Sequence, residues 1–140
     1  MNHAGDLEWI NDYVGVPYLE NGRDRHHGWD CWGLVLAVYR DRLGIELPDW
    51  TWQAPFGPLD KLRAFDSAVR DAIDAGQAVE LEAPEPWAIG LVHGERRPHH
   101  VGVAVNLGVL HAARYGGTQY DPLYRFLRTH PRIKWFRWQR

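Results

Sequence analysis

Hydrophobic side chains change their spacing part-way along this chain. In the first part they recur every three or four residues, which predicts helices over residues 7–13, 31–43 and 59–75. From Trp87 onward they mostly alternate, which predicts strands over residues 87–93, 101–105, 109–113 and 133–138, with a helical turn over residues 123–128. Helices followed by an antiparallel sheet define an α+β domain, so we expect N-terminal helices packed on a C-terminal sheet.

Two connections stand out between these elements. Residues 48–58 are too rich in proline for regular structure and carry Trp50, Trp52 and Phe56, so we expect this loop to pack down or to line a cleft. A tight turn at residues 106–108 joins two of the predicted strands into a hairpin. We expect the last strand, which is rich in arginine and lysine, to lie at an edge of the sheet, where charge opposes aggregation.

Length, composition and charge restrict the number of domains and the classes of partner. A chain of 140 residues with 45% hydrophobic content is long enough for one domain, spanning residues 1–140, with a substantial core. A net charge of −2 argues against a nucleic-acid partner, and no segment approaches a membrane span. Residues 1–6 lack a basic segment and an apolar run, so we expect synthesis in the cytoplasm without a signal peptide.

The single cysteine follows a helix-capping aspartate. Asp30 is predicted to be the N-cap and Cys31 the first helical residue, so the thiol lies at the positive end of the helix dipole, which lowers its pKa. The charge of Asp30 acts in the opposite direction, and a reactive thiol would need a second activator. The alternative is that Cys31 is a small buried hydrophobic residue.

A cysteine nucleophile needs a histidine and a polar group that orients it. His100 shares a strand face with Gly102 and Ala104, whose small side chains would leave room for the central helix, whereas His99 lies on the valine side. His111 is the candidate orienting group on the next strand. A turn at residues 107–108 would place His111 opposite Ala104, so a twist or bulge would have to bring it closer to His100.

With eight histidines in the chain, a zinc site is an alternative to a catalytic site. Its candidate ligands are Cys31, His93, His99, His100 and His111, but their spacing matches no standard zinc motif. We therefore expect neither a metal nor an organic cofactor.

Several short segments together resemble one known family. They are Gly15-Val16-Pro17-Tyr18, Asp30-Cys31-Trp32-Gly33-Leu34-Val35, Leu43-Gly44-Ile45-Glu46-Leu47-Pro48, His100-Val101-Gly102-Val103 and Leu110-His111-Ala112. In this order they resemble the NlpC-type cell-wall cysteine peptidases, which are papain-like peptidoglycan endopeptidases. The tryptophan after the cysteine and the segment at residues 43–48 are most similar to forms encoded with phage or prophage tail genes.

The resemblance implies a role for each matching residue. Cys31 would be the nucleophile, His100 the general base and acid, and His111 the orienting third member. Tyr18 would contribute to the oxyanion site together with the backbone amide of Cys31. Trp32 stands where the family commonly has serine, and we place it with His99 among the substrate-binding residues. Asn21-Gly22 replaces the family's usual pair of glycines.

The resemblance also implies the function. It indicates a cysteine endopeptidase that hydrolyses an amide bond in the stem or cross-link peptides of peptidoglycan, often the bond between D-glutamate and a diamino acid. Trp32 and residues 43–48, which resemble the phage-tail forms, suggest that the protein acts on the cell wall as part of a virion or tail. Tail-tip proteins would then be its partners. Two alternatives remain: an inactive tail-tip assembly protein that uses its aromatic loop as an assembly surface, and a secreted antibacterial amidase toxin.

Overall fold

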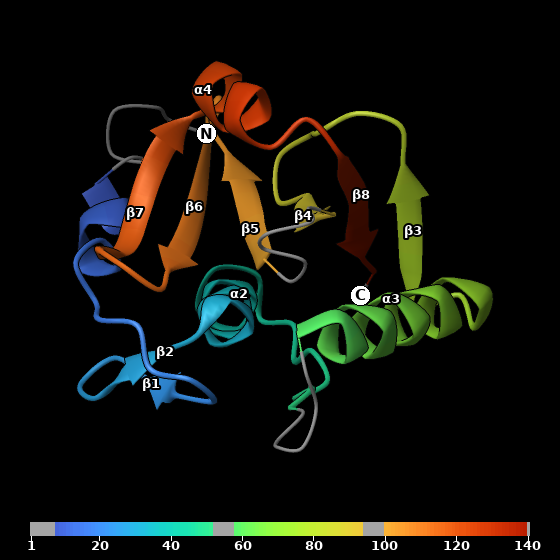
Figure 1. The fold of residues 1–140 in the computed structure, drawn as a ribbon, viewed down its shortest axis with the longest axis horizontal. Helices are drawn as coiled ribbons and strands as arrows, with labels where there is room; N and C mark the ends of the chain where they lie inside the picture. The colour runs from blue at the N-terminus through green and yellow to red at the C-terminus, as the bar shows by residue number, and fades with distance from the viewer. Residues whose placement is uncertain (1–7, 52–57, 94–99, 140) are drawn as a thin grey trace.

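A six-stranded antiparallel sheet with helices on both sides forms the centre of the computed structural model, which describes residues 8–51, 58–93 and 100–139 (Figure 1). The N-terminal elements are the 3-10 helix η1 (Trp9–Asp12), β1 (Arg23–Asp24), β2 (Gly28–Trp29), α2 (Cys31–Val38), the π-helix η2 (Tyr39–Leu43) and α3 (Pro58–Asp74). The sheet and its last helix comprise β3 (Ala78–Leu81), β4 (Ile89–Val92), β5 (His100–Val105), β6 (Gly108–Ala113), β7 (Gly117–Pro122), α4 (Leu123–Thr129) and β8 (Ile133–Trp138). The predicted α+β class is confirmed.

The strand order is β3-β8-β4-β5-β6-β7. Strands β3 and β7 lie at the two ends of this order, and neither was predicted from the sequence. The last strand, β8, is therefore an interior strand between β3 and β4, which corrects the expectation of an edge strand. Its basic side chains do not protect a free edge.

The two faces of the sheet belong to separate hydrophobic clusters. Helices α2 and α3 pack in one cluster with Val101, Val103 and Val105 of β5. Phe126 of α4 packs in the other with Ala104 and its neighbours, and Figure 1 shows α4 apart from α2 and α3. The central helix thus approaches the valine face, which corrects the expectation that the small residues of β5 make room for it. Bulky β-branched side chains offer that helix more apolar surface to bury.

Helix α2 begins and ends at identifiable signals. The Asp30 side chain accepts a hydrogen bond from the backbone N–H of Gly33 at 2.8 Å, which caps the first turn. The helix changes to π geometry at Tyr39 and ends at Gly44, which has a φ of 68°. Glycine adopts that left-handed conformation without a steric penalty. The single helix predicted over residues 31–43 is therefore an α-helix continued by a π-helix.

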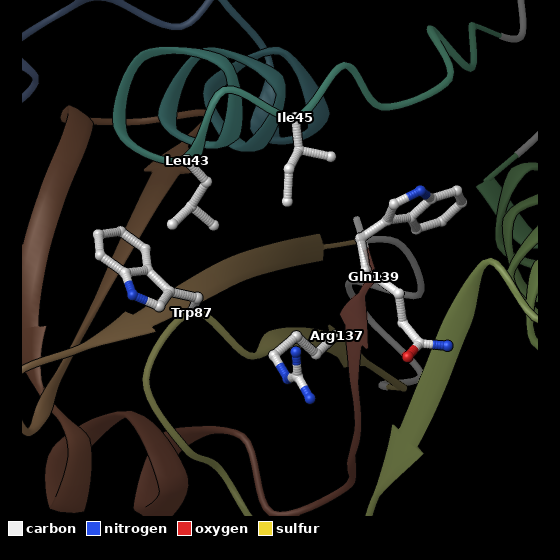
Figure 2. Close-up of a pocket in the computed structure, with 6 residues that line it drawn as sticks. Leu43, Ile45, Trp87, Arg137 and Gln139 are labelled. Atoms are coloured by element: carbon white, nitrogen blue, oxygen red, sulfur yellow. The ribbon is translucent and has the colours of Figure 1, made fainter.

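A pocket of about 340 Å³ lies beyond the C-terminal end of η2 (Figure 2). Leu43, Ile45, Trp87, Arg137, Trp138 and Gln139 line it. At a rise of about 1.5 Å per residue, the α-helix alone places Val38 about 10 Å from Cys31, and Leu43 lies one π-turn further on, so the pocket is distinct from the surroundings of the cysteine. Within the described residues, no helix combines the length and apolar character needed to cross a membrane.

Candidate active site

Cys31 lies at the N-terminal end of α2 with only 2% of its surface exposed. The backbone amides of Cys31 and Trp32 in the first turn of the helix, and that of Val101, act on its sulfur so as to favour the thiolate and lower its pKa. The third amide belongs to the peptide that joins His100 to Val101 at the start of β5. The sulfur of Cys31 is thereby held against the strand that carries His100.

The thiol has a raised pKa. Burial and the adjacent Asp30 carboxylate raise the pKa of Cys31 from its ordinary 9.0 to about 12, although the three amides act in the opposite direction. The sequence predicted a lowered pKa from the helix dipole, and this prediction is wrong for the resting structure because the cost of burying a thiolate outweighs the amides. A base is therefore needed to remove the proton before the sulfur can attack.

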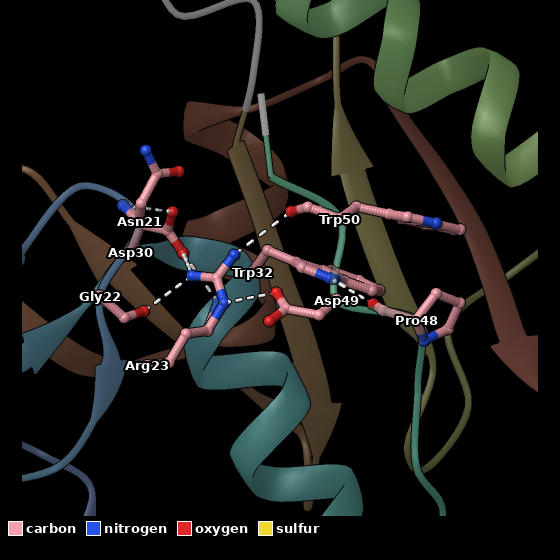
Figure 3. Close-up of polar contacts among 9 residues, drawn as sticks. Asn21, Gly22, Arg23, Asp30, Trp32, Pro48, Asp49 and Trp50 are labelled. Carbon is pink, nitrogen blue, oxygen red and sulfur yellow. Dashed lines mark hydrogen bonds and ion pairs between the residues drawn. The ribbon is translucent and has the colours of Figure 1, made fainter. Parts of the chain in front are cut away.

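Asp30 belongs to a charged group that we call the capping cluster, defined as Arg23, Asp30 and Asp49 (Figure 3). Arg23 binds Asp30 at 2.8 Å and Asp49 at 2.7 Å, and it also donates to the backbone oxygens of Gly22 and Trp50. This guanidinium joins the loop before the cysteine to the loop after η2. The cluster therefore fixes the start of the cysteine helix from two directions.

The loop before the cysteine follows α2 closely. A Cβ at Gly33 would overlap the carbonyl oxygen of Gly22 and crowd Trp29, so glycine at residue 33 allows this approach. Asn21 has a φ of 60°, a left-handed conformation that asparagine tolerates better than most residues. Its backbone N–H donates to Asp30 at 3.0 Å. The Asn21-Gly22 pair can thus adopt a backbone for which two glycines would also be suited.

His100 and His111 contact each other directly. Their Nε2 and Nδ1 atoms are 3.0 Å apart, and both side chains are buried. Phe126 of α4 packs against both rings, and His130 lies 5.8 Å from His100 between ring centroids. The two histidines that the sequence singled out are therefore brought together on the α4 side of the sheet.

The strand register explains this meeting. Asn106 and Leu107 both have positive φ, as in a type I′ turn, and Val105 pairs with Gly108. His111 then pairs with Gly102 and lies diagonally across from His100. The predicted register, with His111 opposite Ala104, is wrong by two residues because the turn begins one residue earlier. No bulge is required to bring the histidines together.

Asp121 is a site residue that the sequence reasoning missed. Its Oδ2 atom lies 2.7 Å from Nε2 of His111, the nitrogen that does not face His100. Asp121 belongs to β7, a strand that the spacing of hydrophobic residues does not predict and that follows directly on the turn-forming pair Gly116-Gly117. The alternation of Thr118 and Tyr120 with Gln119 and Asp121 was the available signal. We call His100, His111 and Asp121 the imidazole chain.

Tyr18 is held close to the cysteine by the segment around it. Residues Gly15 and Val16 pair with Thr118 of β7, and Tyr18 forms a parallel bridge with Trp29. Burial, followed by the charge that Cys31 carries when ionised, raises the pKa of the Tyr18 hydroxyl above its ordinary range. Tyr18 therefore keeps its proton at neutral pH and can donate a hydrogen bond.

Trp32 and His99 are the two residues expected to bind substrate, and the structure describes only the first of them. Trp32 has 1% of its surface exposed, stacks on Trp50 at 5.0 Å and donates from Nε1 to the Pro48 oxygen at 2.9 Å. It is a core residue in this structure, which corrects the expectation of direct substrate contact. His99 lies outside the described residues, as do Trp52 and Phe56 of the aromatic loop.

The histidines and carboxylates of the described ranges do not form a metal centre. No group of three or more histidine, cysteine, aspartate or glutamate side chains there is arranged to hold a metal ion. The His100–His111 contact is a hydrogen bond between rings, and the second nitrogen of His111 is occupied by Asp121.

In this domain a cysteine at the N-terminus of a helix packs on an antiparallel sheet, and that sheet carries a pair of histidines. This is the arrangement of a papain-like α+β domain. The chain belongs to the NlpC/P60 family, whose profile matches residues 15–131. Among solved structures it is similar to the NlpC/p60 domain of the peptidoglycan hydrolase SagA, with a TM-score of 0.59, 18% identity and coverage of 99% of this chain and 100% of that one. It is also similar to a lipoprotein-like NLP/P60 family protein from Staphylococcus aureus, with a TM-score of 0.52, 22% identity and coverage of 95% and 42%.

Two characterised relatives match over shorter segments. Gamma-DL-glutamyl hydrolase of Bacillus subtilis (strain 168) is 50% identical over 36 residues, which are 26% of this chain and 9% of that protein. Tail tip assembly protein K of Escherichia phage N15 is 40% identical over 52 residues, which are 37% of this chain and 21% of that protein. The chain therefore matches only a small part of each of these longer proteins.

Proposed function

We propose that this protein is a cysteine endopeptidase that hydrolyses an amide bond in the stem or cross-link peptides of peptidoglycan. The observation that supports this most strongly is the 3.0 Å hydrogen bond between His100 and His111, one residue before the amide that reaches the sulfur of Cys31. A nucleophile, a base and a group that orients the base are the parts that acyl transfer through a thioester needs.

In this proposal His100 removes the proton from the Cys31 thiol as the sulfur attacks the substrate carbonyl carbon. A carbon–sulfur bond forms, and the carbonyl oxygen becomes a tetrahedral oxyanion. The carbon–nitrogen bond then breaks, and His100 gives its proton to the leaving amine. Water next attacks the thioester while His100 accepts a proton from it, and the thiol is restored as a carboxyl product leaves. The raised pKa of Cys31 makes this base essential at neutral pH.

Tyr18 and the first turn of α2 would stabilise the oxyanion. The Tyr18 hydroxyl remains protonated because burial raises its pKa, so it can donate to developing negative charge near Cys31. The backbone N–H of Cys31, which favours the thiolate form of its own side chain, would supply a second donor. Donors that are already in place before the reaction would lower its reorganisation cost.

The substrate class follows from the family and its relatives. The domain of similar fold belongs to a peptidoglycan hydrolase, and the relative from Bacillus subtilis is named for hydrolysis of gamma-glutamyl bonds. Peptidoglycan stem peptides contain such a bond between D-glutamate and a diamino acid. We therefore place the scissile amide there, and we place the protein at the cell wall.

The test is release of peptide fragments from purified peptidoglycan. We expect the unmodified protein to release them and the Cys31→Ala variant to release none, because the thioester can no longer form. Asp71→Asn, which changes an exposed residue of α3, serves as a control and should release fragments at the unmodified rate. Equal release by the Cys31→Ala variant and the unmodified protein would contradict the proposal.

A second candidate function is assembly into a phage-like tail tip. It is supported by the 40% identity over 52 residues to a tail tip assembly protein. An assembly role would leave the Cys31→Ala variant able to join tail particles, and fragment release would be absent from the unmodified protein as well. Co-sedimentation with tail particles, measured beside the release assay, separates the two functions. Binding combined with cysteine-dependent release would indicate a tail-associated enzyme.

A further inference from the structure

Three polar side chains lie on a diagonal across neighbouring strands. His111 on β6 pairs with Gly102, two residues after His100 on β5. On its other side His111 pairs with Gln119, two residues before Asp121 on β7. Diagonal neighbours on one face of an antiparallel sheet lie within reach of each other's side chains. The strand register therefore places the three side chains of the imidazole chain so that each hydrogen-bonds to the next.

The direction of these hydrogen bonds is determined from the Asp121 end. An ionised carboxylate only accepts hydrogen bonds, so Nε2 of His111 must donate across the 2.7 Å contact. A neutral His111 then has a lone pair on Nδ1, which accepts from Nε2–H of His100 across 3.0 Å. A neutral His100 protonated at Nε2 keeps its lone pair on Nδ1. In that tautomer Nδ1 is the nitrogen that can accept a proton from a thiol.

We propose that Asp121 is a positioning residue that sets the tautomer of His111 and, through it, the tautomer of His100. The inference rests on the proposed function, because it matters for catalysis only if His100 is the base. Without a fixed acceptor at Asp121, His111 could instead carry its proton on Nδ1. It would then donate to Nε2 of His100, and the proton of His100 would occupy the nitrogen that must remove the thiol proton.

The surroundings support a fixed arrangement. The His111 side chain is 7% exposed and that of Asp121 is 26% exposed, so solvent competes only partly for their contact. Phe126 packs on His111 at 4.9 Å between ring centroids and on His100 at 6.3 Å, and His130 at the end of α4 also faces His100. A ring flip of His111 would break both of its nitrogen contacts at once.

Asp121→Asn tests the inference. Asparagine has nearly the same shape, but it can accept through its oxygen or donate through its nitrogen, so the direction of the chain is no longer set. We expect kcat to fall by about 10- to 100-fold, the range for removing a second partner of a functional histidine, with little change in KM or in the melting temperature. Asp71→Asn makes the same chemical change at an exposed site and should alter neither constant.

Imidazole nitrogen-15 chemical shifts give a readout that does not depend on activity. In the unmodified protein we expect Nε2 of both histidines to be protonated and Nδ1 of both to be unprotonated, and in Asp121→Asn we expect His111 to become a mixture. The opposite tautomers in the unmodified protein, or unchanged shifts and unchanged kcat in the variant, would overturn the inference. If the unmodified protein hydrolyses no peptidoglycan, the proposed function fails, while the nitrogen shifts still decide whether Asp121 sets the tautomers.

Discussion

The capping cluster and the imidazole chain each contain a buried or half-buried aspartate, yet the partners of the two carboxylates differ. Asp30 is held by an arginine and two backbone amides, all of which keep their protons across the accessible pH range. Asp121 instead contacts a histidine that contacts another histidine, and both rings can gain or lose protons. The first arrangement fixes the start of the helix that carries Cys31, whereas the second is the one that would move a proton under the proposed function.

The difference has an electrostatic consequence. Asp30 raises the pKa of Cys31, so the capping cluster on its own makes the sulfur less reactive. In the proposed mechanism the imidazole chain compensates by supplying a base with the correct nitrogen available. Changes in the capping cluster should therefore affect mainly stability, and changes in the imidazole chain should affect mainly turnover.

The largest effect is expected from His100→Gln. Glutamine keeps polar contacts but cannot act as a base near neutral pH, so kcat/KM should fall by at least about 10³-fold. The free energy of unfolding should change by less than about 1.5 kcal/mol, since the side chain remains polar and of similar size. Steady-state kinetics and urea unfolding measure the two quantities. A variant that retains a tenth of the activity would remove His100 from the mechanism.

Trp32→Ser separates packing from chemistry beside the nucleophile. Serine restores the residue that the wider family commonly has here, but it removes a buried ring that stacks on Trp50 and meets Phe65 edge-on. We expect a loss of about 3–5 kcal/mol in the free energy of unfolding, measured by urea denaturation. Tyr115→Ser, at a residue 80% exposed, should change it by less than about 0.5 kcal/mol. Equal effects would contradict a core role for Trp32.

Much of this site could be predicted from the sequence because its signals are local. Asp30 before an apolar helix indicates an N-cap, and both histidines lie in alternating segments. The register could not be predicted reliably, since it depends on whether the two-residue turn begins at Asn106 or Leu107. Either choice keeps His111 on the same face, but only the first places it beside His100.

The remaining parts depend on contacts between distant segments. Arg23 joins Asp30 to Asp49 and Trp50 across 26 to 27 residues of sequence, and no local pattern indicates that pairing. The strand that carries Asp121 begins at Gly117, the second glycine of a pair that is typical of a turn. The interior place of β8 depends on β3, a short half-exposed strand with a weak alternation.

Arg23→Met tests the capping cluster itself. The variant leaves the Asp30 carboxylate with only its two amide partners, so we expect a loss of about 1–3 kcal/mol in the free energy of unfolding. Below the unfolding transition, kcat should remain within about threefold, because the imidazole chain is intact. Arg70→Met breaks an exposed ion pair with Glu80 and should cost less than about 0.5 kcal/mol. Similar losses for both arginines would mean that the cluster does not stabilise the helix start.

The smallest effect is expected from Asp30→Asn on the reactivity of Cys31. Because a nearby negative charge disfavours the thiolate, its removal should lower the pKa of Cys31 from about 12 and raise the thiolate fraction at any pH below it. Alkylation by iodoacetamide at pH 9 should then be about 3- to 10-fold faster, as for an interaction of about 1 kcal/mol. In the unmodified protein the alkylation rate should continue to rise above pH 9. A plateau below pH 9, or slower alkylation of the variant, would contradict this electrostatic interpretation.

The central claim is that Cys31 and the imidazole chain together hydrolyse a peptidoglycan amide, and mass analysis of defined muropeptides tests it most directly. We expect the unmodified protein to convert a stem peptide into two fragments whose masses sum to that of the substrate plus one water, with the break after D-glutamate. We expect the Cys31→Ala and His100→Gln variants to leave the substrate intact. Intact substrate with the unmodified protein, or the same fragments with Cys31→Ala, would contradict the claim.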